Sequence, residues 1–177
     1  MRGRTPALLG VALAVIVASI GCTPQPATVD AGTASIASEP AIESAAFVSV
    51  IDGDTIETSA GRVRIIGIDT PERGECGDPQ ASDAIGRILV EGDPIVLELP
   101  AGENDQDRYG RLIRYVTTAA GVDIGLMQLQ AGNAVARYDS SDGYPAHPRE
   151  SDYHAAQLAE LAADGSVIAV GCPHVAP

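Results

Sequence analysis

Residues 47–68 read FVSVIDGDTIETSAGRVRIIGI, and this stretch decides the fold. Apolar and polar residues alternate in three short runs, as they do in strands that bury one face. Asp52-Gly53-Asp54 separates the first two runs and Ala60-Gly61 separates the last two, and both segments are typical of tight turns. The stretch therefore predicts three consecutive antiparallel strands. These strands are expected at 47–51, 55–58 and 62–68.

Further along the chain, the hydrophobic pattern predicts two more strands, at 94–99 and 111–116, and three helices. Asp78, Asp123 and Ser151 are the expected N-caps of these helices. Five short strands with an inserted helix favour the α+β class and a partly open, five-stranded barrel of the oligonucleotide/oligosaccharide-binding (OB) type. An α+β sandwich remains the alternative.

Composition limits what such a domain does. The chain has 177 residues, of which 45% are apolar and 20% charged, and its formal net charge is −13. These values fit one domain and argue against a wholly disordered chain, and no apolar run reaches the roughly 18 residues of a membrane span. Proteins that coat nucleic acid depend on Lys and Arg, whereas this acidic chain has no Lys. We therefore expect any nucleic-acid chemistry to be local.

The N-terminus has the features of an export signal. Arg2 and Arg4 precede the apolar run 7–20, which has the length of a signal-peptide core. We expect residues 1–21 to be removed, which makes the mature chain more acidic still.

The residues before the expected cleavage point, Ser19-Ile20-Gly21-Cys22, resemble a bacterial lipobox. The expected product is a lipoprotein that is anchored through Cys22 to the outer face of the cell membrane. Ser19 replaces the aliphatic residue that is usual there, so a free secreted protein is the alternative. Residues 22–45 are rich in Pro, Ala, Ser and Thr and predict an extended tether before a folded domain at 46–177.

Two cysteines remain in the expected domain, Cys76 and Cys172. In an exported protein two leftover cysteines are more often paired than free, so we expect a disulfide between them. Two unpaired buried thiols are the alternative.

Acidic residues stand at or just beyond the ends of adjacent strands in the expected meander. Asp54, Asp69 and Glu72 could converge at one mouth of the sheet, where their carboxylates would repel one another unless a cation lay among them. Oxygen ligands favour a hard ion such as Ca²⁺ or Mg²⁺. Arg64 and Arg111 lie in nearby strands, and two arginines beside a bound cation suit a phosphate group. Each motif alone is more often an ordinary turn, loop or solvated arginine.

Three segments in this order have a specific resemblance. Residues 50–56 read VIDGDTI, residues 63–72 read VRIIGIDTPE and residues 107–111 read DRYGR. Together they resemble the staphylococcal nuclease (thermonuclease) family, over about Ala46 to Cys172. The resemblance implies an OB-fold barrel with three helices and a Ca²⁺-dependent phosphodiesterase that cuts DNA and RNA and leaves 3′-phosphate products.

The resemblance also implies a role for each matching residue. Asp54 and Asp69 would bind Ca²⁺ through their carboxylates and Thr70 through its backbone carbonyl. Glu72 would be the general base, and Arg64 and Arg111 would bind the scissile phosphate. The expected substrate contacts are Arg108, Tyr109 and Tyr138.

Two departures from the family pattern bear on these expectations. The loop after Glu72 is short and lacks lysines, and the acidic surface predicts weak steering of polyanions. A catalytically silent barrel that binds nucleic acid or another ligand is therefore the alternative to a nuclease. The three histidines, none of them at metal-ligand spacing to another His or Cys, are expected to have surface or packing roles, and the protein is expected to be a monomer.

Overall fold

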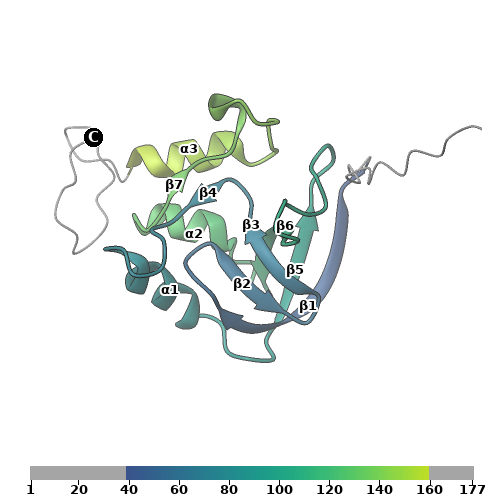
Figure 1. Ribbon diagram of the computed structural model, residues 1–177, viewed down its shortest axis with the longest axis vertical. Helices are drawn as coiled ribbons and strands as arrows, with labels where there is room; N and C mark the ends of the chain where they lie inside the picture. Colours follow the sequence, from purple (N-terminus) through teal and green to yellow (C-terminus); the bar gives the residue numbers. More distant parts are fainter. Residues whose placement is uncertain (1–38, 160–177) are drawn as a thin grey trace, which may run out of the picture. The chain divides into compact units, whose positions relative to one another are not determined.

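Five strands close into a barrel in the order β1-β2-β3-β6-β5 (Figure 1). The computed structural model describes residues 39–159. All neighbouring strands of the barrel are antiparallel except β3 and β6, which run parallel. The predicted class is confirmed, although the barrel is closed rather than partly open. The strands are β1 (Ala41–Val50), β2 (Thr55–Thr58), β3 (Gly61–Ile65), β5 (Pro94–Leu99) and β6 (Leu112–Thr118).

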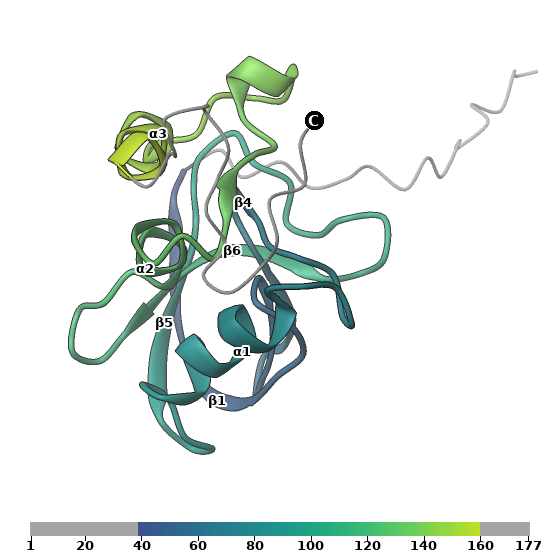
Figure 2. The same cartoon turned by 90° about the vertical axis from the view of Figure 1, so that its left-hand side faces the viewer.

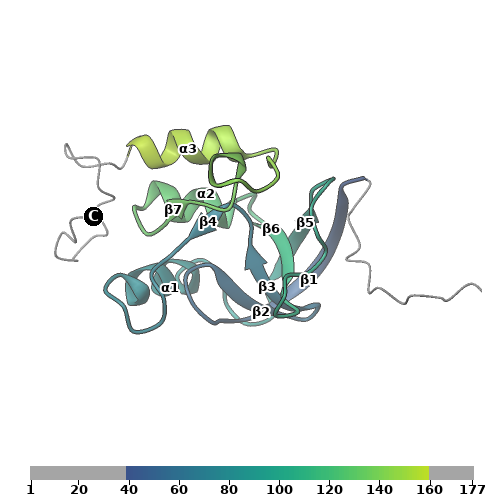
Figure 3. The same ribbon diagram turned by 45° about the horizontal axis from the view of Figure 1, so that its top comes forward.

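The remaining elements cover one side of the barrel. A small two-stranded sheet, β4 with β7, follows β3 beyond the end of the barrel, and α3 packs against its strand β7. Helix α2 packs against β6, and α3 packs on α2, while α1 contacts β1 and α2 (Figures 2 and 3). These elements are β4 (Ile68–Asp69), α1 (Asp78–Gly86), α2 (Ile124–Gln130), β7 (Val135–Ala136), the 3₁₀-helix η1 (Ser140–Asp142) and α3 (Glu150–Ala159).

Strand β1 begins earlier than the sequence pattern indicated. Its first half, Ala41 to Ala46, pairs with β5, and its second half pairs with β2 after a bulge between Phe47 and Ser49. The folded domain therefore starts before Ala46, within the segment expected to be a tether. The side chains of residues 41–44 are exposed, so this half-strand is held by backbone pairing and leaves no hydrophobic pattern in the sequence.

The helix starts agree with the sequence signals to within two residues. The Asp123 carboxylate caps α2 by accepting a hydrogen bond from the Leu126 amide, as predicted. Asp78 is the first residue of α1 rather than its cap, because Gly77 occupies the cap with a φ of 97°. Helix α3 includes Glu150 and so begins before Ser151. No helix within residues 39–159 is long and apolar enough to cross a membrane.

Several expectations fall on residues that the structure does not describe. The signal peptide, the lipidation of Cys22 and the Cys172 end of the expected disulfide with Cys76 all lie outside residues 39–159. These stay predictions.

A buried aromatic cluster joins the barrel to α3. The Tyr115 hydroxyl lies 2.6 Å from His147 Nδ1, and the rings of Tyr115, His147 and Tyr153 meet edge to face. Burial lowers the pKa of His147, which keeps the imidazole neutral. Gly67 leaves room for this cluster, since a Cβ at this position would lie 2.6 Å from His147 Nε2. The packing role expected for His147 is what the structure shows.

We predict that Gly67→Ala destabilises the protein by about 3 kcal/mol or more, because it combines a backbone penalty with a steric clash. Gly67 has a φ of +77°. Gly121 is the matched control: its φ is +82°, but nothing lies within 4 Å of its Cβ position, so Gly121→Ala is expected to cost about 1 kcal/mol. Urea unfolding monitored by circular dichroism measures both. Equal losses in the two variants would contradict the steric role of Gly67.

Candidate functional site

Asp54 lies in the turn between β1 and β2, and its side chain is almost completely buried, with 7% of the residue exposed. The Asp54 amide donates to the Asp52 carboxylate over 3.2 Å, and the Asp54 carbonyl accepts from the Ile65 amide at the end of β3. These bonds set the direction of the Asp54 side chain. Burial, followed by the charge of Asp54, raises the pKa of Asp52.

Three residues satisfy the buried Asp54 carboxylate. Oδ2 accepts hydrogen bonds from the amide of Thr70 at 2.9 Å and from its hydroxyl at 3.1 Å. Oδ1 accepts from the Thr55 hydroxyl at 3.0 Å and lies 3.3 Å from Arg64 Nε. The carboxylate is therefore held in place from β2, β3 and the segment after β4.

Arg64 connects Asp54 to Asp69. Its Nη2 lies 3.3 Å from Asp69 Oδ1, so two carboxylates share one guanidinium. The Tyr138 hydroxyl also reaches Asp69 Oδ1, at 3.3 Å, and the Tyr138 ring lies 5.3 Å from the Arg64 guanidinium carbon. Burial, helped by the Asp69 charge, raises the pKa of Tyr138, so this hydroxyl stays protonated and donates. Tyr138 has a φ of 62°, a conformation rare for non-glycine residues.

Arg111 joins the same network from the start of β6. Its Nε lies 2.7 Å from Asp107 Oδ2, and its Nη1 lies 3.3 Å from the Thr55 hydroxyl, which in turn donates to Asp54. Burial acts to raise the pKa of Asp107, but hydrogen bonds from the backbone and side chain of Arg111 outweigh it and hold the pKa below its usual value. Asp107 is therefore an ionised anchor that orients Arg111.

Exposed aromatic and basic side chains border this network. Tyr109 is 68% exposed, and the guanidinium carbons of Arg108 and Arg111 lie 4.7 Å and 5.5 Å from the centre of its ring. The expected substrate contacts Arg108, Tyr109 and Tyr138 thus lie beside the two arginines of the network.

Glu72 is the predicted site residue that the structure does not connect to the others. Its side chain is exposed and makes no hydrogen bond or ion pair within residues 39–159. Its backbone amide donates to the Glu75 carboxylate at 3.0 Å, which places Glu72 in a turn before α1. Glu72 is thus left accessible to solvent two residues after Thr70, on the segment that contacts Asp54.

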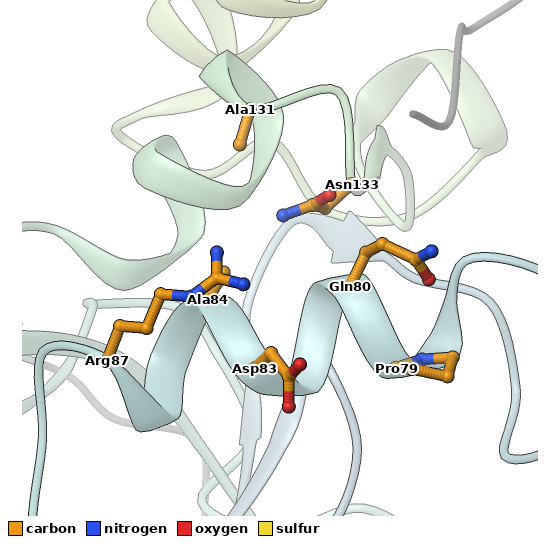
Figure 4. Close-up of a pocket in the computed structure, with 7 residues that line it drawn as sticks. All are labelled: Pro79, Gln80, Asp83, Ala84, Arg87, Ala131 and Asn133. Carbon is orange, nitrogen blue, oxygen red and sulfur yellow. The ribbon is translucent and has the colours of Figure 1, made fainter. Parts of the chain in front are cut away.

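Two hollows lie near α1. One, of about 260 Å³, is lined by Asp69, Thr70 and Pro71 together with Glu75 and residues 132–135, so it adjoins the network. The other, of about 480 Å³, lies between α1 and the end of α2 (Figure 4). Its lining residues are Pro79, Gln80, Asp83, Ala84, Arg87, Ala131 and Asn133, none of which belongs to the predicted site.

Sequence reasoning missed the buried amides that support the site from behind. Gln128 Nε2 donates to the carbonyls of Gly53 and Ala81, each at 2.8 Å, and Gln128 Oε1 accepts from Asn133 at 2.9 Å. Gly53 is required here, because a Cβ would lie 2.4 Å from that of Ala81 and 2.8 Å from the Thr70 hydroxyl. A polar residue on the apolar face of a helix was the signal that could have revealed Gln128.

The donor groups fit a hard divalent cation. Asp54 and Asp69 lie close enough to contact the same guanidinium, and Asp69 Oδ2 makes no hydrogen bond with other described residues. The adjoining Thr70 adds a backbone carbonyl, which completes an all-oxygen set of the kind that Ca²⁺ or Mg²⁺ prefers. The role of each residue toward such an ion stays a prediction.

Comparisons with known proteins give a family match for more than half of the chain. The family model described as staphylococcal nuclease homologue matches residues 62–161. The chain is 36% identical over 135 residues to the succinoglycan biosynthesis protein ExoI of Rhizobium meliloti (strain 1021), a match that covers 70% of this chain and 64% of that protein.

Two other relatives are named as endonucleases. An uncharacterized endonuclease of Escherichia coli is 32% identical over 91 residues, which cover 49% of this chain and 56% of that protein. Endonuclease YhcR of Bacillus subtilis (strain 168) is 30% identical over 101 residues, which cover 48% of this chain and 8% of YhcR. The chain thus spans less than two thirds of the length of each of these curated relatives.

We predict that Gln128→Leu lowers the free energy of unfolding by about 2 to 4 kcal/mol, because it removes the hydrogen bonds of Gln128 to the carbonyls of Gly53 and Ala81 and to the buried Asn133 amide. The matched control is Gln130→Leu on the same helix, whose side chain is exposed and whose loss is expected to stay within about 0.5 kcal/mol. Urea unfolding measures both values. A Gln128→Leu protein as stable as the control would show that the buried amides do not support the Asp54 turn.

Proposed function

The chain belongs to the staphylococcal nuclease family, and on this premise we propose that it is a Ca²⁺-dependent phosphodiesterase that hydrolyses DNA and RNA. The observation that carries the proposal is that two guanidiniums are held beside one buried anion, the Asp54 carboxylate. Arg64 contacts Asp54 directly, and Arg111 is connected to it through the Thr55 hydroxyl. Relatives named as endonucleases support the same reading.

Two oriented arginines suit the phosphodiester in particular. Hydrolysis places extra negative charge on the non-bridging oxygens of the phosphate, and donors fixed in advance stabilise that charge without reorganising. Asp107 and Thr55 orient Arg111, while Asp54 and Asp69 orient Arg64. Arg64 is the more enclosed of the two, with 13% of its side chain exposed against 26% for Arg111. Arg111 is therefore the better placed to follow the departing oxygen.

The proposed reaction forms one bond and breaks one. The Glu72 carboxylate accepts a proton from a water molecule as the water oxygen attacks phosphorus. The P–O5′ bond breaks, and the departing oxygen takes a proton from a solvent water to become a 5′-hydroxyl, which leaves a 3′-phosphate on the other product. Glu72 suits this role because its exposed carboxylate is bound to no other described residue.

Asp54, Asp69 and the Thr70 carbonyl would hold Ca²⁺. When bound, such an ion supplies positive charge that polarises the phosphate and water. In its absence the Asp54 and Asp69 carboxylates rely on Arg64 alone for positive charge within 4 Å among the described residues. A bound cation would leave this guanidinium free to bind phosphate.

The substrate strand is proposed to lie across the exposed tyrosines. Tyr109 and Tyr138 each present a ring beside arginines, an arrangement that accepts any base because every base has a π-face to stack. The net charge of −13 works against long-range attraction of polyanions, so we expect weak affinity and a strong dependence on divalent cation.

The proposed location is the outer face of the cell membrane. It is supported by the lipobox-like residues before Cys22 and by the basic, then apolar N-terminus. A disulfide between Cys76 and Cys172 belongs to the same proposal, since oxidising compartments favour such bonds. We propose that the enzyme acts there as a monomer.

Digestion of single-stranded DNA by the purified full-length chain, with Ca²⁺ or with a chelator, tests the proposed activity. We expect Ca²⁺-dependent cleavage that falls by about 10²-fold or more in Glu72→Gln and in Arg111→Ala, because one removes the base and the other a phosphate ligand. The 3′-phosphate ends are detected as primers that a polymerase extends only after phosphatase treatment.

Glu91→Gln and Arg87→Ala are the matched controls, since both side chains are exposed and lie outside the network. Both should keep wild-type activity, and circular dichroism checks that all four variants fold. Activity that is equal in wild type and in the Glu72 and Arg111 variants would point to a contaminant. Binding of DNA without cleavage would instead establish the catalytically silent barrel.

A further inference from the structure

A second group of metal-ligating side chains lies at the start of α3. Glu150 and His154 are four residues apart on this helix, which puts them on the same face. Asp139, the residue before η1, faces them from the preceding loop. One ligand atom from each of the three side chains lies within 4.8 Å of the other two.

Asp139 is the buried member of this group. The residue is 0% exposed, and its Oδ1 accepts hydrogen bonds from the amide and hydroxyl of Ser141 at 2.9 Å and 2.6 Å. Its Oδ2 is buried without a hydrogen-bond partner of good geometry and points to His154 Nε2, 2.7 Å away. Within the cluster, the His154 imidazole is therefore the one group beside the buried Asp139 Oδ2 that could offset its negative charge.

Glu150 is oriented in a way that suits a ligand. The Ser140 amide donates to Oε2 at 3.2 Å, and the Ser140 hydroxyl donates to Oε1. Such hydrogen bonds fix the direction of a carboxylate, as they do for the carboxylate ligands of metal sites. His154 is the accessible member, since 36% of its side chain is exposed, and it gives an ion a route into the cluster.

Two carboxylates at this distance repel each other unless positive charge lies between them. A proton on His154 Nε2 supplies such charge, and a metal ion bound to the neutral imidazole would supply more. One imidazole nitrogen with two carboxylate oxygens is a set of ligands that Zn²⁺ can bind, and its nitrogen distinguishes it from the all-oxygen set around Asp54 and Asp69. Tetrahedral coordination would leave one position for water.

We propose that Asp139, Glu150 and His154 form a second metal site that binds Zn²⁺. An ion held there ties the loop before η1 to α3. Tyr138 directly precedes Asp139, and its hydroxyl reaches Asp69, so the ion steadies the segment that carries this tyrosine. The inference does not rest on the proposed nuclease activity, because it concerns binding alone.

Titration of the metal-free full-length chain with Zn²⁺ alone, followed by isothermal calorimetry, tests this site. We expect one zinc ion to bind per chain. We expect the zinc affinity to fall at least tenfold in His154→Asn and in Glu150→Gln. Asp152→Asn is the matched control, because it removes one charge from an exposed position in the same turn of α3 and should leave zinc binding unchanged. Asp69→Asn should also leave it unchanged, which separates this site from the one around Asp54.

A second readout follows the fold. Zinc should raise the melting temperature of the wild type and of Asp152→Asn but not that of His154→Asn, since a ligand stabilises only the state that binds it. Zinc affinity that is the same in wild type, His154→Asn and Glu150→Gln would overturn the proposal. So would the absence of wild-type binding at 100-fold molar excess of zinc over protein.

Discussion

The buried carboxylate of Asp54 is the interaction on which the arrangement of the site depends. An ionised group removed from water is stable only where hydrogen bonds and opposite charge replace its hydration. Thr70, Thr55 and Arg64 do this here, and each comes from a different segment of the chain. Satisfying one anion therefore fixes β2, β3 and the segment after β4 relative to one another, and Arg111 is joined to the same anion through Thr55.

The helices hold this arrangement from behind. Gln128 in α2 binds the carbonyl of Gly53 and so supports the turn that presents Asp54. On the other side of the small sheet, Gly67 admits the ring of His147, whose Nδ1 meets the buried hydroxyl of Tyr115. The two glycines therefore also matter to this arrangement. Gly53 lets Ala81 and Thr70 approach the Asp54 turn, and Gly67 lets His147 approach the chain before β4.

The sequence predicted the elements whose side chains are buried and missed the half-strand whose side chains are mostly exposed. The alternating pattern of 47–68 located β2 and β3, and Asp123 marked the start of α2. The first half of β1 could not be found, because its exposed side chains carry no pattern. In the site, Asp54, Asp69 and Glu72 were expected to converge. Asp54 and Asp69 do lie together, because both contact Arg64, but the Glu72 side chain contacts neither of them. The link from Thr55 to Arg111 spans 56 residues, and no local signal predicts it.

The pairing of β1 with β5 and of β3 with β6 has a consequence for how the chain acquires its structure. Both pairings join segments that are far apart in sequence, and the barrel closes only when β6 has been made. Contacts of this kind slow folding, because bringing distant segments together costs loop-closure entropy before the contacts can stabilise the fold. The closed barrel therefore cannot form until the chain has been made as far as Thr118, and this delay would suit the proposed export of the chain in extended form.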